Sequence, residues 1–157
     1  MTLKEEMQKF GFATVNYPSY LTRLVREMMG SWQTFCELPL QTKSRFTYTG
    51  DAGAGYEFKD EPGATKDRKE NFHFTISEMN RLVAISNETG IGRRFADNAL
   101  SLLIAIRSPL GDFAQRLEGE FGLEGVRDEV FESWSRWFLR LLHYPPGAEL
   151  GQIIAAH

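Results

Sequence analysis

The sequence predicts an α+β fold in a single domain over residues 1–157. Two stretches place apolar residues at spacings of three and four, which is the period of an amphipathic helix. A third stretch, near the C-terminus, alternates two unlike sets of side chains with the period of two of a β-strand. The chain is 42% hydrophobic and 25% charged, a composition typical of one globular domain. We therefore expect a helix-rich region over about 1–132, followed by strands over 133–157.

The N-terminal segment predicts a short helix, a turn and a strand. Leu3, Met7 and Phe10 have the spacing of one helical face, and Gly11 supplies the turn. The β-branched and aromatic residues of 12–16 then favour a strand.

The first long helix is expected between a start signal at Pro18-Ser19 and a stop signal at Leu38-Pro39. The stop follows because a residue that precedes proline is disfavoured in the α conformation. The apolar face of this helix consists of Leu21, Leu24, Val25, Met28, Met29, Trp32, Phe35 and Cys36. We interpret this face as core packing.

Residues 47–67 are rich in glycine and proline and predict one long loop. No Gly-Lys-Ser/Thr follows the glycines, which argues against a phosphate-binding loop. The alternation over 72–76 predicts a short strand. His73 points away from its two phenylalanine neighbours there, and we interpret it as a structural or solvated histidine.

A cluster of charged residues precedes this strand. It consists of Asp67, Lys69 and Glu70. We interpret it as a solvated charge cluster, with a role in a pocket as the alternative.

The second half of the chain predicts another long helix and two strands. The helix covers 95–117, and Pro109 should bend it because proline lacks the backbone donor and crowds the preceding turn. The alternation from Trp134 to Tyr144 predicts a strand that Pro145-Pro146-Gly147 ends. Residues 152–157 predict a further strand.

Charge and composition restrict the classes of partner. The net charge of -3 provides no broad basic field, so we expect no binding to nucleic acid or to a membrane surface. No apolar run approaches the ~18 residues of a membrane span, and the N-terminus has no apolar region typical of a secretory signal. The single cysteine, Cys36, agrees with a reducing compartment, and the cytoplasm is the expected location. Acidic or neutral small ligands remain compatible with this net charge where a local pocket supplies the cation.

Local spacing alone identifies no complete catalytic or metal site. The three histidines are His73, His143 and His157, and none belongs to a His-Glu-x-x-His or His-x-x-x-His pattern. No Gly-x-Ser-x-Gly nucleophile motif is present in the sequence.

Three blocks, in this order, resemble the N-terminal half of the 2-oxoglutarate and Fe(II)-dependent oxygenases of the isopenicillin N synthase-like type. The first comprises Phe10-Gly11-Phe12, Val15-Asn16, the long helix and Leu38-Pro39 with Lys43 and Phe46, similar to "GF...VxN" and "LPxxxKxxF". The second comprises Gly55-Tyr56, Asp67-Arg68-Lys69-Glu70 and Phe72-His73-Phe74, similar to "GY...DxKExFxF". The third runs from Leu139 to Pro146 and from Ala155 to His157, similar to "LRxNxYPP" and the approach to an "HxD" motif. The chain departs from this pattern at Leu142, where the family often has Asn, and at Tyr17-Pro18, where it often has His-Gly.

The resemblance implies a double-stranded β-helix, or jelly roll, with helices on its outer face. It also implies an oxidoreductase, a dioxygenase that uses Fe(II), 2-oxoglutarate as co-substrate and O2. Two histidines and one carboxylate suit Fe(II) and leave coordination positions open for the other reactants. Residues 133–157 would then be the first strands of the barrel.

The resemblance assigns two site residues, and the charge of Arg140 adds a third candidate. His157 corresponds to the first iron ligand, and Tyr144 to a tyrosine that contributes to binding the 2-oxo acid. A buried tyrosine with a hydrogen-bonded hydroxyl is the structural alternative for Tyr144. Arg140 presents a cation suited to an acidic co-substrate, with a surface ion pair as its alternative.

The other iron ligands and the arginine that holds 2-oxoglutarate would lie beyond residue 157. We therefore expect the 157-residue chain to be inactive alone and to be completed by the C-terminal half of the same protein. The alternative is a non-catalytic truncated domain that binds a ligand or a partner. The substrate, the choice among hydroxylation, desaturation and cyclisation, and the oligomeric state do not follow from the sequence.

Overall fold

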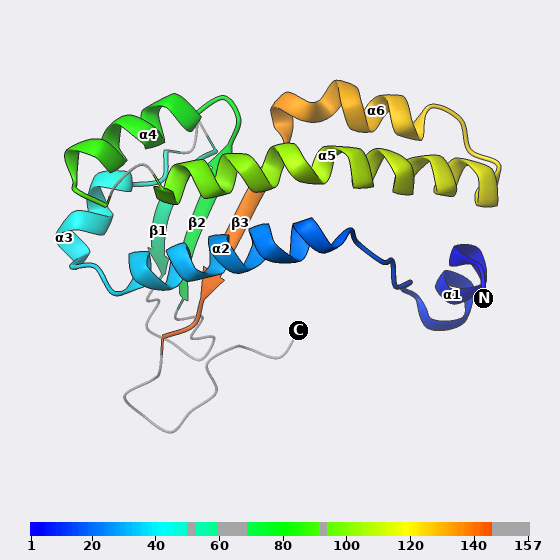
Figure 1. Ribbon diagram of the computed structural model, residues 1–157, viewed down its shortest axis with the longest axis horizontal. Coiled ribbons are helices and arrows are strands. Elements are labelled where there is room, and N and C mark those ends of the chain that lie inside the picture. The colour runs from blue at the N-terminus through cyan, green and yellow to red at the C-terminus, as the bar shows by residue number, and fades with distance from the viewer. Residues whose placement is uncertain (50–52, 60–68, 92–93, 146–157) are drawn as a thin grey trace.

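A computed structural model describes residues 1–49, 53–59, 69–91 and 94–145 of the chain. The helices are α1 (Leu3–Phe10), α2 (Ser19–Cys36), α3 (Leu40–Lys43), α4 (Met79–Glu88), α5 (Arg94–Phe121) and α6 (Val126–Glu132), with 3-10 turns at Ser44–Phe46 and Ser133–Arg136. The strands are β1 (Gly55–Lys59), β2 (Lys69–Thr75) and β3 (Phe138–His143). The strands form one antiparallel sheet in the order β1-β2-β3. The predicted α+β class is therefore confirmed, and α2 and α5 run side by side across one face of the sheet (Figure 1).

The N-terminal helix forms as predicted, but the strand expected over 12–16 is wrong. Thr2 caps α1 by accepting a hydrogen bond from the Glu5 amide, and Gly11 ends the helix in the left-handed conformation. Residues 12–16 adopt neither helix nor strand, and no strand among the described residues pairs with them. High β-propensity does not form a strand without a neighbouring strand to pack and bond against.

The two long helices lie where their apolar periods place them. Phe35 of α2 is fully buried, and its ring stacks on Phe95 of α5 at a centroid distance of 4.8 Å. The same ring meets Phe72 of β2 edge-on at 5.1 Å. Phe35 therefore joins both helices to the sheet. The helix α5 continues through Pro109, and the bend expected there stays a prediction.

The strand β1 corrects the prediction of one continuous loop over 47–67. Its backbone pairs with β2 from Gly55, opposite His73, to Lys59. Gly55 has a φ of 124°, and a Cβ there would overlap the carbonyl oxygen of Phe46. Glycine thus allows the close approach that starts β1, although in the sequence it indicates a loop.

The strand predicted from Trp134 to Tyr144 is shorter than expected. It begins at Phe138, because residues 133–136 form a 3-10 turn. Trp134 in this turn makes an edge-on ring contact with Trp137, which follows the turn. The Trp137 indole donates a hydrogen bond to the Ser133 hydroxyl across this turn. The helices α4 and α6 were not predicted, and the strand expected over 152–157 lies outside the described residues.

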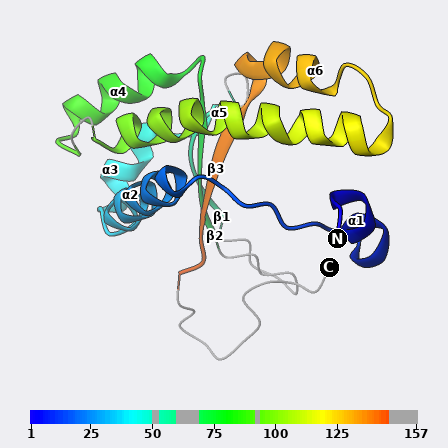
Figure 2. The same cartoon turned by 45° about the vertical axis from the view of Figure 1, so that its right-hand side comes forward.

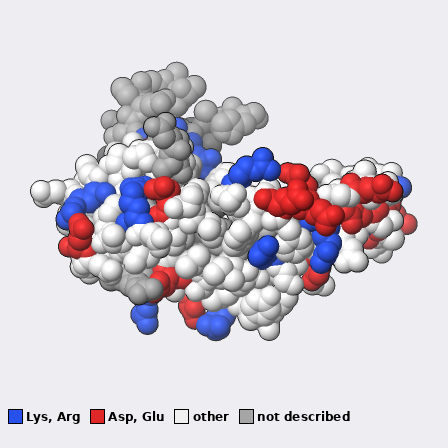
Figure 3. Space-filling model, turned by 90° about the horizontal axis from the view of Figure 1, so that it is seen from above, with Lys and Arg blue, Asp and Glu red and all other residues white. Residues whose placement is uncertain are grey.

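The molecule extends well beyond the sheet on the side away from α4. The C-terminal part of α5 reaches out there with α6 and α1 beside it (Figure 2). Acidic side chains gather at this end, whereas Lys and Arg are scattered among acidic residues elsewhere on the same face (Figure 3). Among the helices of the described ranges, none has both the length and the apolar character needed to cross a membrane.

We expect Phe35→Ala to lower the free energy of unfolding by about 3–5 kcal/mol, because it leaves a cavity between the helices and the sheet. The matched control is Phe12→Ala, since Phe12 is 65% exposed. That control should change the free energy by less than about 0.5 kcal/mol. Urea unfolding of both variants measures the difference, and equal losses would contradict the central role of Phe35.

Candidate functional site

The two faces of the sheet carry different chemistry. The register places Phe72 opposite Tyr56 and Leu141, and all three are buried on the face that the helices cover. The same register places His73 opposite Gly55 and Arg140 on the other face. Directly paired residues of antiparallel strands share a face, so each face combines side chains from all three strands.

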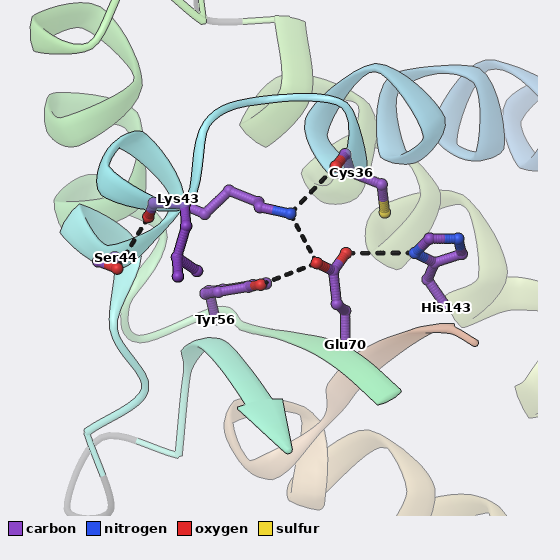
Figure 4. A network of polar contacts seen from close by, with 7 residues as sticks. Cys36, Lys43, Ser44, Tyr56, Glu70 and His143 are labelled. Atoms are coloured by element: carbon purple, nitrogen blue, oxygen red, sulfur yellow. Dashed lines mark hydrogen bonds and ion pairs between the residues drawn. The ribbon is translucent and has the colours of Figure 1, made fainter. Parts of the chain in front are cut away.

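A polar cluster lies on the helix-covered face, at one end of the sheet (Figure 4). Glu70 is the second residue of β2 and pairs directly with His143, the last residue of β3. Tyr56 comes from β1, and Lys43 and Cys36 end the helices α3 and α2. Five separate elements therefore contribute to this cluster.

Glu70 is the centre of the cluster. The Lys43 ammonium donates to Glu70 Oε1 at 2.6 Å and to the Cys36 carbonyl oxygen at 3.0 Å. The Tyr56 hydroxyl also donates to Oε1, at 3.0 Å, and His143 Nδ1 lies 3.2 Å from Oε2. The Lys43 and Glu70 side chains are each 8% exposed, whereas the His143 side chain is 37% exposed.

The contacts around Glu70 set its charge state. Burial alone would raise its pKa, but hydrogen bonds from Lys43, His143 and Tyr56 outweigh burial and hold the pKa below its ordinary value. Glu70 is therefore an anion at neutral pH. Burial, together with this nearby negative charge, raises the pKa of the Tyr56 hydroxyl.

The Cys36 thiol responds to the same carboxylate. Burial first, and then the charge and hydrogen bonding of Glu70, raise the pKa of Cys36 to about 12. Without a bound cation the sulfur is protonated, which makes it a poor nucleophile.

The interpretation of Glu70 as part of a solvated charge cluster is wrong. Glu70 is 6% exposed and ion-paired, whereas Lys69 is half-buried and Asp67 lies outside the described residues. A usable signal was present: extending the alternation of Phe72 and Phe74 back by two residues places Glu70 on their buried face.

The residues expected to bind an acidic co-substrate do not belong to this cluster. Arg140 lies on the opposite face of the sheet, which no helix among the described residues covers and which we call the open face. It has no ion-pair partner among the described residues. Tyr144 follows directly after β3 and is 37% exposed, and both interpretations of this tyrosine stay predictions. His157, the expected metal ligand, lies outside the described residues.

The open face combines polar and apolar groups. Asn71 Oδ1 and His73 Nε2 are buried there and have no hydrogen-bond partner among the described residues. Burial and the nearby Arg140 guanidinium lower the pKa of His73, so its ring is neutral at neutral pH. Phe138 and Leu142 are 59% and 44% exposed on β3. His73 is thus half-buried among the groups of this face, and sequence reasoning gave it no such neighbours.

An apolar cavity of about 630 Å³ lies where α2 and α5 meet the start of β3. Its lining includes Met28 and Met29 from α2 and Leu103 and Ile106 from α5. Such a lining suits an apolar group rather than a charged one.

Comparisons with family models, with curated proteins and with solved structures found no match to this chain.

We expect Lys43→Met and Glu70→Gln each to lower the free energy of unfolding by about 3–5 kcal/mol, because each leaves the other group buried without its ionic partner. The double variant should lose less than the sum of the two single losses. The control is the exposed pair of Arg23 and Glu27, whose coupling should be about 0.5 kcal/mol or less. Denaturant unfolding of the single and double variants measures the coupling in both pairs. Additive losses at Lys43 and Glu70 would contradict the coupling between these two buried charges.

The lowered pKa of Glu70 predicts an acid-sensitive contribution to stability. The unfolded chain takes up this proton near the ordinary value of 4.5, whereas the folded chain takes it up only at lower pH. The contribution is therefore complete above pH 4.5 and is lost as the pH falls through the lowered pKa. The stability difference between wild type and Glu70→Gln should stay constant from neutral pH to pH 4.5 and shrink as the pH falls further. Urea unfolding across this range checks it, and a constant difference would refute it.

Proposed function

We propose that this chain forms the N-terminal half of a cytoplasmic 2-oxoglutarate and Fe(II)-dependent dioxygenase of the isopenicillin N synthase-like type, acting on a small organic substrate. The observation that carries the proposal is the two-sided sheet. Helices cover one face, and the other face presents Arg140, with Tyr144 directly after its strand. In the jelly roll implied by the resemblance, helices lie outside and the reaction takes place on the inner face.

The open face has the chemistry of a surface that is covered in the complete protein. Phe138 and Leu142 expose large apolar side chains there, which a second sheet would remove from water. β3 pairs only with β2 among the described residues, so its other edge is available for further strands. We propose that the C-terminal half of the same protein supplies this second layer.

The described residues of this face fit an acidic co-substrate. The Arg140 guanidinium has no carboxylate partner among the described residues, so it is available for charge-assisted hydrogen bonds to 2-oxoglutarate. The Tyr144 hydroxyl can donate a further hydrogen bond to the same ligand.

His157 would hold the iron together with a carboxylate two residues later and a second histidine from the C-terminal half. Residues two apart on a strand point to the same side, which permits both to reach one ion. When bound, Fe(II) supplies the activation of O2 that these side chains cannot perform.

The complete natural protein should consume 2-oxoglutarate when supplied with Fe(II), O2 and its substrate. His157→Ala should lower the Fe(II) content and abolish this consumption, because one of three protein ligands is lost. Iron analysis of the purified protein and an assay for succinate measure the two effects. Normal turnover with normal iron content would exclude His157 as a ligand.

Tyr144→Phe should weaken 2-oxoglutarate binding by roughly 0.5–1.5 kcal/mol, the worth of one hydrogen bond, without changing stability. Tyr17→Phe is the matched control, because Tyr17 is 52% exposed and lies far from β3 in the sequence. Titration of the iron-loaded protein with 2-oxoglutarate measures both affinities. An unchanged affinity in Tyr144→Phe would reject this role.

A non-catalytic domain that binds an apolar ligand is the second candidate, and the cavity between α2, α5 and β3 favours it. Tandem mass sequencing of the natural protein across His157 separates the two candidates. A carboxylate two residues after His157 supports the dioxygenase. Its absence, together with binding of an apolar ligand that a bulky Ile106→Trp substitution blocks, supports the binding domain.

A further inference from the structure

Three metal-binding side chains converge in the polar cluster on the helix-covered face. Cys36 Sγ, one Glu70 carboxylate oxygen and a ring nitrogen of His143 all lie within 4.8 Å of one another. They come from the end of α2, from β2 and from β3, so three separate elements build the arrangement (Figure 4).

We propose that Cys36, Glu70 and His143 form a binding site for a divalent transition-metal ion, with Zn²⁺ as the best chemical match. The site uses none of the residues assigned to the iron, and the proposal stands whether or not the proposed dioxygenase function holds. Zn²⁺ accepts thiolate, imidazole and carboxylate ligands together, and three protein ligands with one open position are a common zinc arrangement.

The geometry requires only small movements. In a tetrahedral zinc site, with bonds of about 2.0–2.3 Å, the ligand atoms lie roughly 3.5 Å apart. Glu70 Oε2 and His143 Nδ1 are already 3.2 Å apart. All separations in the group are within 4.8 Å, so small side-chain rotations would close the remaining difference.

The surrounding contacts leave the correct carboxylate oxygen for the ion. Lys43 and Tyr56 both donate to Glu70 Oε1, which fixes the carboxylate from behind, while Oε2 faces His143. Hydrogen bonds of this kind orient a metal ligand. The Lys43 ammonium stays on Oε1, so it does not occupy the position that we propose for the metal ion.

Charge and access also fit a divalent ion. When the metal–sulfur bond forms, the Cys36 thiol releases its proton to water, so thiolate and carboxylate supply two negative charges beside the metal ion and the Lys43 ammonium. The His143 side chain is 37% exposed, so an ion can reach the site from solvent beside it. Water can then occupy the fourth coordination position of the ion.

Cobalt(II) is the probe that isolates this site, because a thiolate bound to Co²⁺ gives a near-ultraviolet charge-transfer band. Cys36 is the only cysteine of residues 1–157, so within this chain such a band comes from its sulfur. We expect the band to appear when the purified protein is titrated with Co²⁺, and to disappear when Zn²⁺ is added in equal amount.

Variants assign the remaining ligands. Cys36→Ser should abolish the band, and His143→Gln should weaken Co²⁺ binding by at least about tenfold, since loss of an outer contact alone costs that much. His157→Gln is the matched control and should leave the band unchanged, because it removes only the expected iron ligand. Far-ultraviolet circular dichroism confirms that each variant is folded.

Other outcomes would overturn the proposal. Absence of the band in the wild-type protein, or its persistence at full affinity in folded His143→Gln, would show that these residues do not form a metal site. Loss of the band in His157→Gln would place the sulfur in the iron site instead.

Discussion

The structure depends most on the buried ion pair of Lys43 and Glu70. Lys43 ends the short helix α3, and Glu70 belongs to the central strand β2. Tyr56 from β1 and His143 from β3 reach the same carboxylate, so Glu70 links all three strands to the helical layer. Two buried charges cost several kcal/mol each in lost hydration, and this cost is offset only where every remaining donor and acceptor is satisfied. In this network Lys43 has two acceptors and Glu70 has contacts to both carboxylate oxygens, which favours one relative position for these elements.

The sequence predicts an element correctly where the pattern that indicates it lies within one short segment. The helix α2 was predicted because its buried side chains recur along one segment, and α5 for the same reason. Glu70 was misplaced because a carboxylate among other charges indicates solvent, whereas its buried partner Lys43 lies 27 residues away. No local pattern records a contact at that separation. The end of α2 shows the same limit, since Cys36 was predicted on an apolar face and also reaches a carboxylate.

The open face illustrates a different limit. The alternation in the sequence correctly placed Arg140 and Leu142 on one side of a strand. It did not indicate which side the helices cover, because both sides of β3 carry apolar residues. The aromatic ring of Phe35 decides this, since it packs on Phe72 and so commits the Phe72 side of the sheet to the core. Polar groups such as Arg140 are left to the other side.

A single register connects the polar cluster with the open face. The pairing that brings His143 opposite Glu70 also brings Arg140 opposite His73. Because side chains alternate along a strand, a shift of β3 by one residue would turn His143 away from Glu70 and would bury Arg140 under the helices. The Trp32 indole reinforces the observed register by donating a hydrogen bond to the Leu142 carbonyl oxygen at 3.2 Å. Trp32 and Glu70 thus hold the orientation of β3. Arg140 is exposed on the open face for that reason.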